Sequence, residues 1–493
     1  MMAAGPAGVL GRTATALARR ATRGYVVGGL VRDALLQRHT ADVDIAVEDD
    51  ALQVAPAVAA ALGGRAITLD AENGVARVVP GQAAAGDSWQ IDISTIRGDI
   101  CQDLQRRDFT ISAMAVDLEC LPGHAAASLI DPCGGRADLA HRLVRSLGEA
   151  AFTADPVRLL RGVRLAAELG FEIETTTAAQ MRRQARRLGG APGERLREEL
   201  LRLLAVPGAG SWLEEMDRLG LLTVLVPELE AGRHMQQPPE HHWDVLQHSL
   251  KTVTAVEFLL GQARWEYVSD DLRQDIAWPD AAAYFEKETG HGSTMASLIK
   301  LAALLHDIAK PPTRSFDASG RMRFLGHPAA GATITAAVLK RLRFSTRETR
   351  LVETMVAQHL RPTQMSHQGL PSHRAVYRFL RDCGEAAPGV LLLSLADHLA
   401  SRGPQLVPDA WQAHAGIVNH VLAQRAEQAE RTGPARLVDG HILMDALGLR
   451  PGPELGALLE AVKEAQAAGE VKTPQQAVDY ARRRLAEADR GNR

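Results

Sequence analysis

The sequence has few of the features that mark secreted or membrane proteins. Only four of its 493 residues are cysteines (Cys101, Cys120, Cys133 and Cys383), and their spacing fits neither a metal motif nor a disulfide pattern. We therefore expect reduced thiols in a cytoplasmic protein. No run of about 18 apolar residues occurs, which excludes a transmembrane helix. The N-terminal segment also lacks an apolar stretch long enough for a signal peptide, and it favours a short leading helix over a transit peptide.

An excess of charge of one sign is also missing. The chain has 56 Lys and Arg against 59 Asp and Glu, so any nucleic-acid partner would need a local basic surface. Its length predicts two to four domains. Strand-like segments are confined to the first third, and beyond about residue 131 Ala, Leu, Arg and Glu recur at helical spacing. We therefore expect an α+β protein with a small β-sheet head, including helices, followed by a long all-α body.

A glycine turn and paired acids stand out near the N-terminus. "YVVGG" predicts a strand that ends at Gly28 and Gly29, and a helix follows, an arrangement that can bind anions. In "DVDIAVE", strand alternation places Asp42 and Asp44 on one face. Such a pair is often only a solvated strand edge. If it instead holds a cation, oxygen ligands favour Mg²⁺, and a third acid is expected on a neighbouring strand. Asp92 in "QIDISTIRG" supplies that acid.

Three motifs, "GGLVRD", "DVD" and "RRDFTISAMAVDL", resemble the head-domain motifs of class II tRNA nucleotidyltransferases and the related bacterial poly(A) polymerases. The resemblance implies that Asp42 and Asp44 hold catalytic Mg²⁺, with Asp92 at the acidic strand position. Ser112 stands where the family usually has asparagine. The resemblance also implies nucleotide contacts from the glycine turn and the RRD segment, namely Gly28, Gly29, Arg32, Asp33, Arg106, Arg107 and Asp108.

The next segment, "ADPVR", resembles the EDxxR motif of the same family, with Ala154 in place of glutamate. Asp155 and Arg158 lie three residues apart and so share a helix face, where they can offer an acceptor and a donor to a base edge. The resemblance implies that this pair selects C and A without a nucleic-acid template; a plain salt bridge is the alternative. Arg161 and Arg164 extend the basic face and are further candidates for nucleotide binding.

A second arginine cluster follows in "MRRQARRLGG". Its side chains are candidates for contacts with tRNA phosphates, although solvated helix faces often look the same. The cluster consists of Arg182, Arg183, Arg186 and Arg187.

The body contains a second constellation of possible ligands, each beside an apolar helical segment. Imidazole and carboxylate together suit a divalent transition metal such as Mn, Fe, Ni or Zn. The pattern resembles the two-metal form of the HD superfamily of phosphohydrolases, which also includes inert scaffolds. Lys310 could neutralise a substrate phosphate, and residues 262–298 look like an insertion over the site. The ligands are His248, His306, Asp307, His327, His359 and Asp397.

The resemblance covers most of the chain and divides it into four parts. These are a nucleotidyltransferase head (1–145), a helical neck (146–235), an HD-type domain (236–425) and a helical tail (426–493). The implied partners are the 3′ end of tRNA with CTP, and ATP in some members.

Four reactions fit this family: addition of CCA, of CC, of A, or of poly(A) tails. Full CCA-adding relatives carry a flexible loop before the RRD segment, whereas here only residues 98–105, "GDICQDLQ", separate Arg97 from Arg106. This favours a CC-adding enzyme that leaves the terminal A to a separate partner. A complete CCA-adding enzyme, an A-adding or poly(A) enzyme, and an HD phosphodiesterase with an inactive head are the alternatives. The HD domain could trim phosphates from damaged RNA ends.

Overall fold

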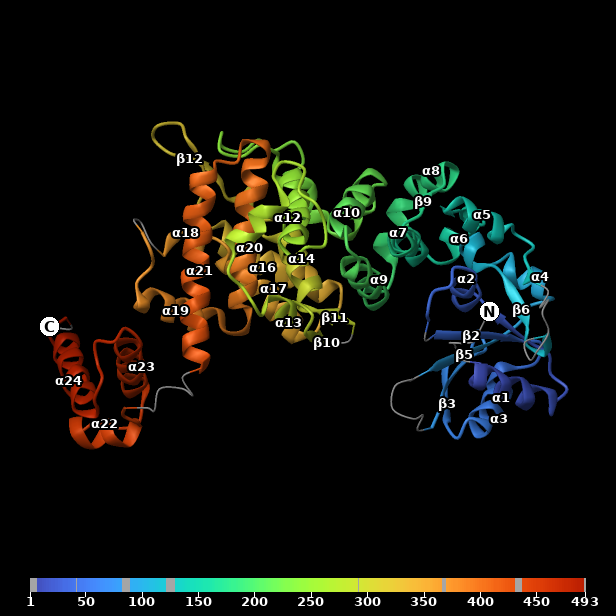
Figure 1. Cartoon of the computed structure of the whole chain (residues 1–493), viewed down its shortest axis with the longest axis horizontal. Helices are drawn as coiled ribbons and strands as arrows, with labels where there is room; N and C mark the ends of the chain where they lie inside the picture. Colours follow the sequence, from blue (N-terminus) through green and yellow to red (C-terminus); the bar gives the residue numbers. More distant parts are fainter. Residues whose placement is uncertain are drawn as a thin grey trace. The chain divides into compact units, whose positions relative to one another are not determined.

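The computed structural model describes residues 7–40, 42–81, 89–120, 129–290, 292–365, 369–430 and 437–491. The chain forms two compact units, one of residues 1–199 and 215–225 and the other of residues 200–214 and 226–493 (Figure 1). Within the described ranges, no helix is long and apolar enough to cross a membrane. The four cysteines are free thiols.

A seven-stranded sheet forms the centre of the first unit, in the order β3-β4-β5-β2-β1-β6-β7. β2 and β5 run parallel, and the other neighbours run antiparallel. The strands are β1 (Gly24–Val27), β2 (Asp42–Val47), β3 (Arg65–Asp70), β4 (Val75–Val79), β5 (Gln90–Thr95), β6 (Ala115–Asp117) and β7 (Leu129–Ile130). The expected sheet head is confirmed.

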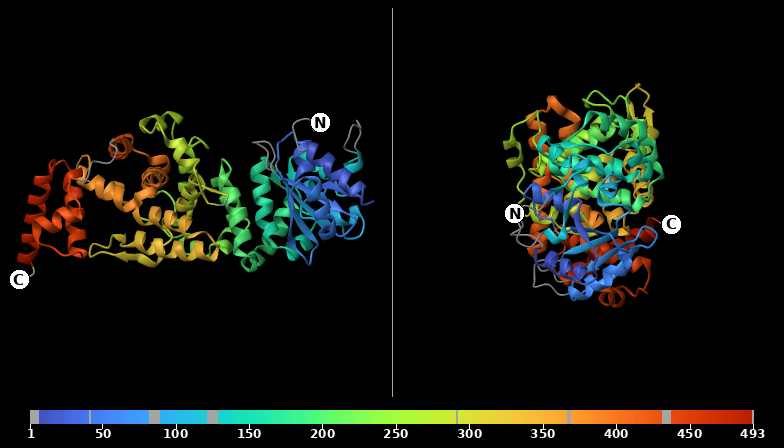
Figure 2. Two further views of the ribbon diagram at one scale, coloured as in Figure 1. Left: turned by 90° about the horizontal axis from the view of Figure 1, so that it is seen from below. Right: turned by 90° about the vertical axis from the view of Figure 1, so that its right-hand side faces the viewer.

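The two faces of the sheet differ in chemistry. Val43, Ile45 and Ile93 are buried on one face, which the apolar side of α3 (Ala51–Ala61) covers (Figure 2). Strand alternation turns Asp42 and Asp44 to the opposite face. Elsewhere that second face is also apolar and packs beneath the segment after β5. The acids therefore occupy a polar part of an otherwise buried surface.

Helices alternate with the strands of the head along the chain and continue into the neck. The expected leading helix is confirmed as α1. In the head the helices are α1 (Ala7–Ala18), α2 (Gly29–Leu35), α3 (Ala51–Ala61), α4 (Ile100–Leu104) and α5 (Gly135–His141). A short parallel pair, β8 (Leu143–Val144) and β9 (Glu172–Ile173), lies among the neck helices α6 (Glu149–Ala154), α7 (Val157–Leu169), α8 (Thr175–Gln184), α9 (Gly193–Ala205), α10 (Ala209–Arg218) and α11 (Leu222–Leu225). Of these, α9 and α10 are divided between the two units.

The second unit has a helical core formed chiefly by α12, α14, α16, α17 and α20. A buried ion pair joins two of these helices, since Lys300 Nζ of α14 lies 2.9 Å from Glu257 Oε1 of α12. The helices before the tail are α12 (Val245–Leu259), α13 (Ala281–Phe285), α14 (Met295–Leu305), α15 (Lys310–Thr313), α16 (His327–Arg341), α17 (Thr346–Gln358), α18 (Arg361–Gln364), α19 (His373–Cys383), α20 (Ala387–Arg402) and α21 (Pro408–Glu430).

Strands are not confined to the first third of the chain, contrary to the sequence-based expectation. Two short antiparallel hairpins interrupt the helical body: β10 (Glu288–Gly290) with β11 (Ser293–Thr294), and β12 (Arg314–Phe316) with β13 (Met322–Phe324). The segment expected to be an insertion over the HD site is anchored on α21, where the Trp411 Nε1–H donates to Asp275 Oδ2 at 2.8 Å and the Asn419 amide donates to the Asp275 carbonyl at 2.7 Å.

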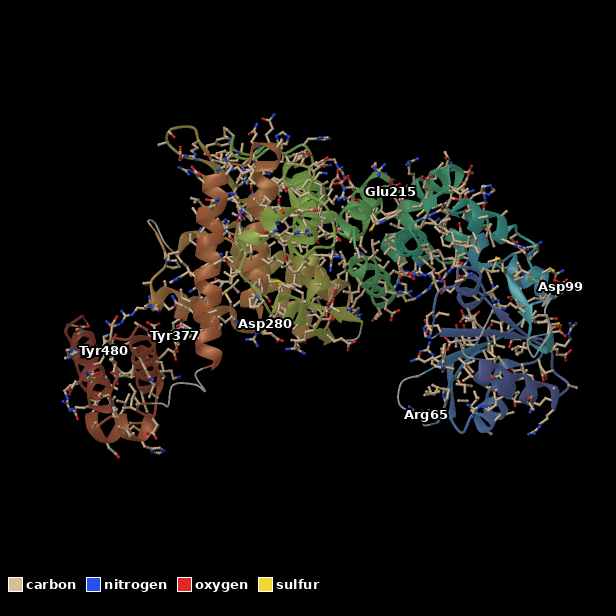
Figure 3. All side chains as sticks on the ribbon, in the orientation of Figure 1. Arg65, Asp99, Glu215, Asp280, Tyr377 and Tyr480 are labelled. Atoms are coloured by element: carbon tan, nitrogen blue, oxygen red, sulfur yellow. The ribbon has the colours of Figure 1, made fainter. Side chains whose placement is uncertain are left out.

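The tail is a helical module with an apolar core of its own, built from α22 (Gly440–Leu447), α23 (Pro453–Ala467) and α24 (Pro474–Gly491). Its acidic side chains meet a row of arginines on α19, as in the pair between Arg378 and Glu464 at 2.8 Å. Tyr377 and Tyr480, labelled in Figure 3, mark the two sides of this contact, which includes a hydrogen bond from Tyr377 to Glu460.

Candidate active site and metal centre

Three acids gather on one face of the head sheet, as the sequence predicted. Asp42 and Asp44 share a face of β2, and Asp44 is the direct register partner of Asp92 on the parallel strand β5. Asp42 is exposed, and Asp44 and Asp92 are half-buried. The three carboxyl groups therefore occupy neighbouring positions on the sheet surface.

An arginine that the sequence analysis missed belongs to this group. Arg77 on β4 pairs with Asp92 in the sheet register, and its Nε and Nη2 lie 2.7 and 2.9 Å from the two carboxylate oxygens. Both oxygens of Asp92 are thus engaged, whereas those of Asp42 and Asp44 remain the better candidates for metal ligands. The sheet register, which is not visible in sequence spacing, is the signal that identifies Arg77.

Asp44 is held in an environment that disfavours its ionised form. Burial raises the pKa of Asp44 to about 6, and the charges of Asp92 and Asp42 act in the same direction while Arg107 opposes them. A divalent cation at this point would remove the repulsion between the carboxylates. Hard oxygen donors of this kind fit Mg²⁺.

The glycine turn lies directly against these acids. Gly28 has φ of 71°, and a Cβ there would lie 3.1 Å from Asp44 Oδ2 and 3.2 Å from Arg107 Nη1. A side chain would therefore occupy the space between the acid and the arginine. Gly29 begins α2, and Arg32 is turned toward its neighbour, with Nε and Nη2 donating to the Asp33 carboxylate at 2.8 and 3.0 Å.

The residues of the RRD segment point in different directions. Arg107 reaches the Gly28 turn and forms an ion pair with Asp103 at 3.4 Å. Arg106 is exposed, with Nη1 3.4 Å from the Arg97 carbonyl. Asp108 is buried and accepts a hydrogen bond from the Phe109 N–H at 2.8 Å. Of the three, Arg107 is therefore the residue closest to the acids of the sheet.

Asp155 and Arg158 lie beside each other, but a third residue holds the aspartate. Arg158 Nε is 3.9 Å from Asp155 Oδ2, whereas Arg195 of α9 contacts both carboxylate oxygens, at 3.0 and 2.6 Å. Although burial favours the neutral acid, hydrogen bonds from Arg195 lower the pKa of Asp155. Arg158 also reaches the carbonyl of Arg106 at 3.5 Å, which links the pair to the RRD segment. The sequence analysis missed Arg195.

Arg161 and Arg164 were expected to extend the basic face, and nucleotide binding by these two arginines stays a prediction. Arg164 is only 5% exposed and forms ion pairs with Glu199 and Glu168. Arg161 bridges Glu199 at 2.9 Å and Asp108 at 3.1 Å. Both arginines thus belong to a network of ion pairs that connects the neck helices to Asp108 of the RRD segment.

The four arginines proposed for RNA contacts are all exposed. Arg182 and Arg183 lie in the last turn of α8, and Arg186 and Arg187 in the 3₁₀ turns that follow it. Arg183 is ion-paired with Glu149, so this cluster is not uniformly available. Their contact with phosphates stays a prediction.

The six residues of the HD pattern come together in the second unit. His248 lies on α12, His306 and Asp307 follow α14, and the others come from α16, α17 and α20. His248 Nε2 lies 3.1 Å from Asp397 Oδ1 and 3.3 Å from Asp307 Oδ2. Around Asp307, the Nε2 atoms of His306, His327 and His359 lie at 3.2, 3.4 and 3.9 Å.

Backbone carbonyls fix the orientation of three of the imidazoles. His306 Nδ1 lies 2.8 Å from the Ala303 carbonyl, and His327 Nδ1 lies 2.7 Å from the Phe324 carbonyl. His359 Nδ1 lies 2.8 Å from the Val356 carbonyl. This contact places a proton on Nδ1 and turns Nε2 inward, the orientation that metal-ligating histidines require. Among the described residues, Nε2 of His327 and of His359 is buried without a hydrogen-bond partner.

The charges of this cluster also fit a bound cation. Burial opposes protonation of His306, but the adjacent Asp307 and Asp397 carboxylates outweigh it and raise the pKa of His306 to about 10. Burial lowers the pKa of His359 to about 4, which keeps its lone pair available. Lys310 contributes positive charge at 2.6 Å from Asp307 Oδ2. Nitrogen and oxygen donors in this mixture fit divalent transition metals.

Comparison with known proteins finds three matching families along the chain. Residues 24–145 match the family described as the poly A polymerase head domain, residues 170–232 a probable RNA- and SrmB-binding site of polymerase A, and residues 278–402 the HD domain. His248 lies outside the HD match although it joins the cluster.

Two relatives match the chain over nearly its full length. The A-adding tRNA nucleotidyltransferase of Deinococcus radiodurans is 34% identical over 93% of this chain and 94% of its own. The CC-adding tRNA nucleotidyltransferase of Thermus thermophilus is 34% identical over 92% of each. The structure of the Thermotoga maritima CCA-adding enzyme complexed with tRNA has the same fold, with a TM-score of 0.59, 21% identity, and coverage of 97% of this chain and 95% of that one. The chain therefore belongs to the family of tRNA nucleotidyltransferases and related poly(A) polymerases, as an enzyme that carries an HD domain.

Proposed function

We propose that the enzyme adds two cytidylates from CTP to the 3′ end of tRNA and then stops, leaving the terminal A to a separate enzyme. The observation that supports this most strongly is the short connection at residues 98–105. It contains α4, whose first turn is closed by a capping box between Asp99 (labelled in Figure 3) and Gln102. This connection leaves no room for a long mobile loop that would re-orient the base-selecting pair for ATP.

Sequence similarity alone does not separate the possible products, since an A-adding and a CC-adding relative are equally identical to the chain. Complete CCA addition from CTP and ATP is the main alternative. The test uses tRNA that ends before CCA, incubated with Mg²⁺, CTP and ATP, followed by sequencing of the 3′ ends. Ends that stop at CC are expected. Ends that reach CCA would refute the argument from the short connection while leaving the family assignment intact.

The proposed reaction forms a bond between the tRNA 3′-oxygen and the α-phosphorus of CTP, and breaks the bond to the pyrophosphate. A divalent cation held by Asp42 and Asp44 would supply positive charge to the phosphates and to the attacking hydroxyl. Gly28 leaves the backbone open to the triphosphate, and Arg107 lies beside the same point. Arg77 orients Asp92 next to the two ligands. The chain's own contribution is positioning and electrostatic stabilisation.

In this proposal Asp155 and Arg158 choose the base. Arg158→Ala should reduce discrimination between CTP and other nucleotides roughly tenfold to a hundredfold, because one good pair of base-edge hydrogen bonds contributes about 1–3 kcal/mol. The KM for the triphosphate should change less. Nucleotide incorporation is measured in competition between CTP and UTP or ATP. The matched control is Arg65→Ala, which removes an exposed arginine on β3 that belongs to neither site. Unchanged CTP preference in Arg158→Ala would refute the base-selecting role.

Transfer at low Mg²⁺ should decline as the pH falls through about 6. The pKa of Asp44 is raised to about 6, mainly by burial, so the carboxyl group is neutral below that pH and binds a cation poorly. Cation and proton compete, so a higher Mg²⁺ concentration should move the midpoint to lower pH. Initial rates across pH at two Mg²⁺ concentrations test this. A midpoint that does not depend on Mg²⁺ would assign the pH profile to another group.

We further propose that the HD cluster hydrolyses phosphate or cyclic phosphate groups at damaged RNA 3′ ends, which would restore the hydroxyl that the head extends. The inward-turned Nε2 atoms around Asp307 favour this activity over an inert scaffold. Divalent transition metals held there would supply Lewis-acid chemistry when bound. Lys310, beside Asp307, would meet the substrate phosphate. An HD phosphodiesterase with an inactive head is less favoured, because Asp42, Asp44 and the glycine turn are all in place.

We retain the fourfold division of the chain as part of the proposal. The head (1–145) would carry transfer, the neck (146–235) base selection and RNA contacts, the HD-type domain (236–425) hydrolysis, and the tail (426–493) a further helical module.

A further inference from the structure

The hairpin of β12 and β13 presents two chemically different faces. Its register pairs Arg314 with Phe324, Ser315 with Arg323, and Phe316 with Met322. Because side chains alternate along a strand, Arg314, Phe316, Met322 and Phe324 share one face, which we call the aromatic face. Arg323 and Ser315 lie on the other face. The aromatic face therefore combines two aromatic rings with one guanidinium group.

One end of the aromatic face adjoins the HD cluster. Lys310 Nζ lies 5.6 Å from the centre of the Phe324 ring and 2.6 Å from Asp307 Oδ2. The ring of Phe324 is 6.5 Å from that of His327, and its carbonyl lies 2.7 Å from His327 Nδ1. The aromatic face and the HD cluster thus adjoin each other at Phe324. Phe316 lies two register pairs further out, roughly 7 Å along the strand.

The hairpin and the residue after it expose apolar surface without an evident structural reason. Phe316 lies next to the turn, and Leu325 directly follows β13. Phe316 is 61% exposed and Leu325 is 78% exposed, the two highest values among the large hydrophobic side chains described. An exposed aromatic ring beside a charged site is a recurrent feature of surfaces that stack nucleobases.

The charge of the hairpin points to an anionic partner. Residues 310–325 contain four basic side chains and one acidic one, Asp317. Arg321 and Arg323 are neutralised by Glu240 and Asp317, at 2.8 and 3.0 Å. Arg314 is exposed and has no ion pair with any acid in the part of the chain that the structure describes. Its charge is therefore available on the same face as Phe316.

We propose that the aromatic face binds the unpaired 3′-terminal nucleotides of an RNA and delivers the terminal phosphate to the HD cluster. A base stacks on Phe316, Arg314 contacts the preceding phosphodiester, and Lys310 receives the terminal phosphate. The occupant is single-stranded RNA, because an exposed aromatic ring beside positive charge is the combination that stacks and holds unpaired bases. The inference rests on the proposed hydrolysis of RNA-end phosphates and adds the residues that bind the substrate.

Photocrosslinking of the full-length protein tests where the RNA end lies. The probe is a short single-stranded RNA that ends in 4-thiouridine 3′-phosphate, irradiated in EDTA so that no turnover occurs. Crosslinks are expected in the peptide that contains residues 314–325. Phe316→Ala and Arg314→Ala should each reduce that crosslink roughly tenfold, and Phe316→Tyr should restore it, since stacking needs a ring. Phe316 is exposed, so its replacement should leave the thermal unfolding midpoint unchanged.

Arg323→Ala is the matched control, because it removes an arginine from the opposite face of the same hairpin. It should leave the crosslink unchanged. Equal crosslinking in all variants, or crosslinks only outside residues 314–325, would refute the proposal that the aromatic face binds RNA. Sedimentation analysis tests a second copy of the chain as the occupant. If the protein were a dimer that Phe316→Ala converts to a monomer, and crosslinking did not depend on Phe316, the aromatic face would be a dimer interface and the proposal of RNA binding would be refuted.

Phosphate release from the same RNA in the presence of Mn²⁺ separates this inference from the activity on which it rests. The loss caused by Phe316→Ala should appear as a higher KM, whereas Asp307→Asn should abolish release. Phosphate release with the same KM in wild type and Phe316→Ala would support hydrolysis by the HD cluster and refute RNA binding by the aromatic face. Crosslinking that depends on Phe316, without any phosphate release from the wild-type enzyme, would support RNA binding by the aromatic face and refute the hydrolysis.

Discussion

Replacement of Asp42 by alanine is expected to lower the rate of CTP transfer by about a thousandfold or more. Charge stabilisation by a metal contributes several kcal/mol to a phosphoryl transfer, and each 1.36 kcal/mol is a factor of about ten in rate. Asp42 is an exposed residue on β2, so the substitution leaves the sheet core intact. Single-turnover transfer measures the rate, and tRNA affinity, measured separately, should be unchanged.

The control for this prediction is Glu72→Ala, which removes an exposed acid from the turn between β3 and β4 of the same sheet. It tests whether loss of any negative charge from the head slows transfer. Asp44→Ala should resemble Asp42→Ala. If Asp42→Ala retained transfer at a comparable rate, the assignment of the paired acids as metal ligands would be wrong.

Glu257→Ala is expected to lower the free energy of unfolding of the second unit by about 3–5 kcal/mol, because it leaves a buried ammonium group without its partner. The Glu257 carboxylate is fully buried and accepts hydrogen bonds from the backbone N–H groups of Ala209 and Gly210, at 2.7 and 3.0 Å, as well as the ion pair from Lys300. Burial lowers the pKa of Lys300, and Glu257 counters that effect. Calorimetric unfolding of the full chain provides the measurement.

Two comparisons interpret that result. Glu257→Gln keeps acceptors for the two N–H groups but removes the charge, so it isolates the ion pair. Addition of Lys300→Met to Glu257→Ala should recover part of the lost stability, because no unpaired charge then remains. An unchanged unfolding temperature in Glu257→Ala would show that the pair is solvated. The pair joins the helices that carry His248 and lead to His306, so metal content should fall together with stability.

The acidic surface of the head was predictable because it depends on short-range rules. Alternation within β2 places Asp42 and Asp44 on one face whatever the rest of the fold does. Arg77 was not predictable, since its contact with Asp92 depends on the register between β4 and β5. A change of register by one residue would turn it to the other face.

The neck shows the limit of helical spacing. Spacing indicates that Arg161 and Arg164 share a helix face, but it does not reveal whether that face is buried. The decisive partner is Glu199, 35 residues beyond Arg164, on the helix that also sends Arg195 to Asp155. Because Arg195 and Glu199 are four residues apart, a single face of α9 contacts both the pair proposed to select the base and the ion pairs of Arg161 and Arg164.

In the body, the ligands of the HD cluster could be recognised by their apolar neighbours and their order along the chain, but their convergence required tertiary structure. The β12–β13 hairpin did carry a local signal. In "RSFDASGRMRF", alternating residues flank a turn sequence that contains Asp317 and Gly320, a pattern typical of hairpins. The helical composition of the surrounding sequence outweighed it.

The capped helix α4 has a consequence for how this enzyme could acquire a new product. A segment inserted within residues 100–104 would have to break the capping box of Asp99 and Gln102 before it gained any mobility. A segment inserted between Arg97 and Gly98 would leave α4 folded and would end at a glycine whose φ of 88° already permits a change of chain direction. The chain thus offers a position at which loop length can vary independently of head stability, and evolution could alter the number of added nucleotides there without rebuilding the fold.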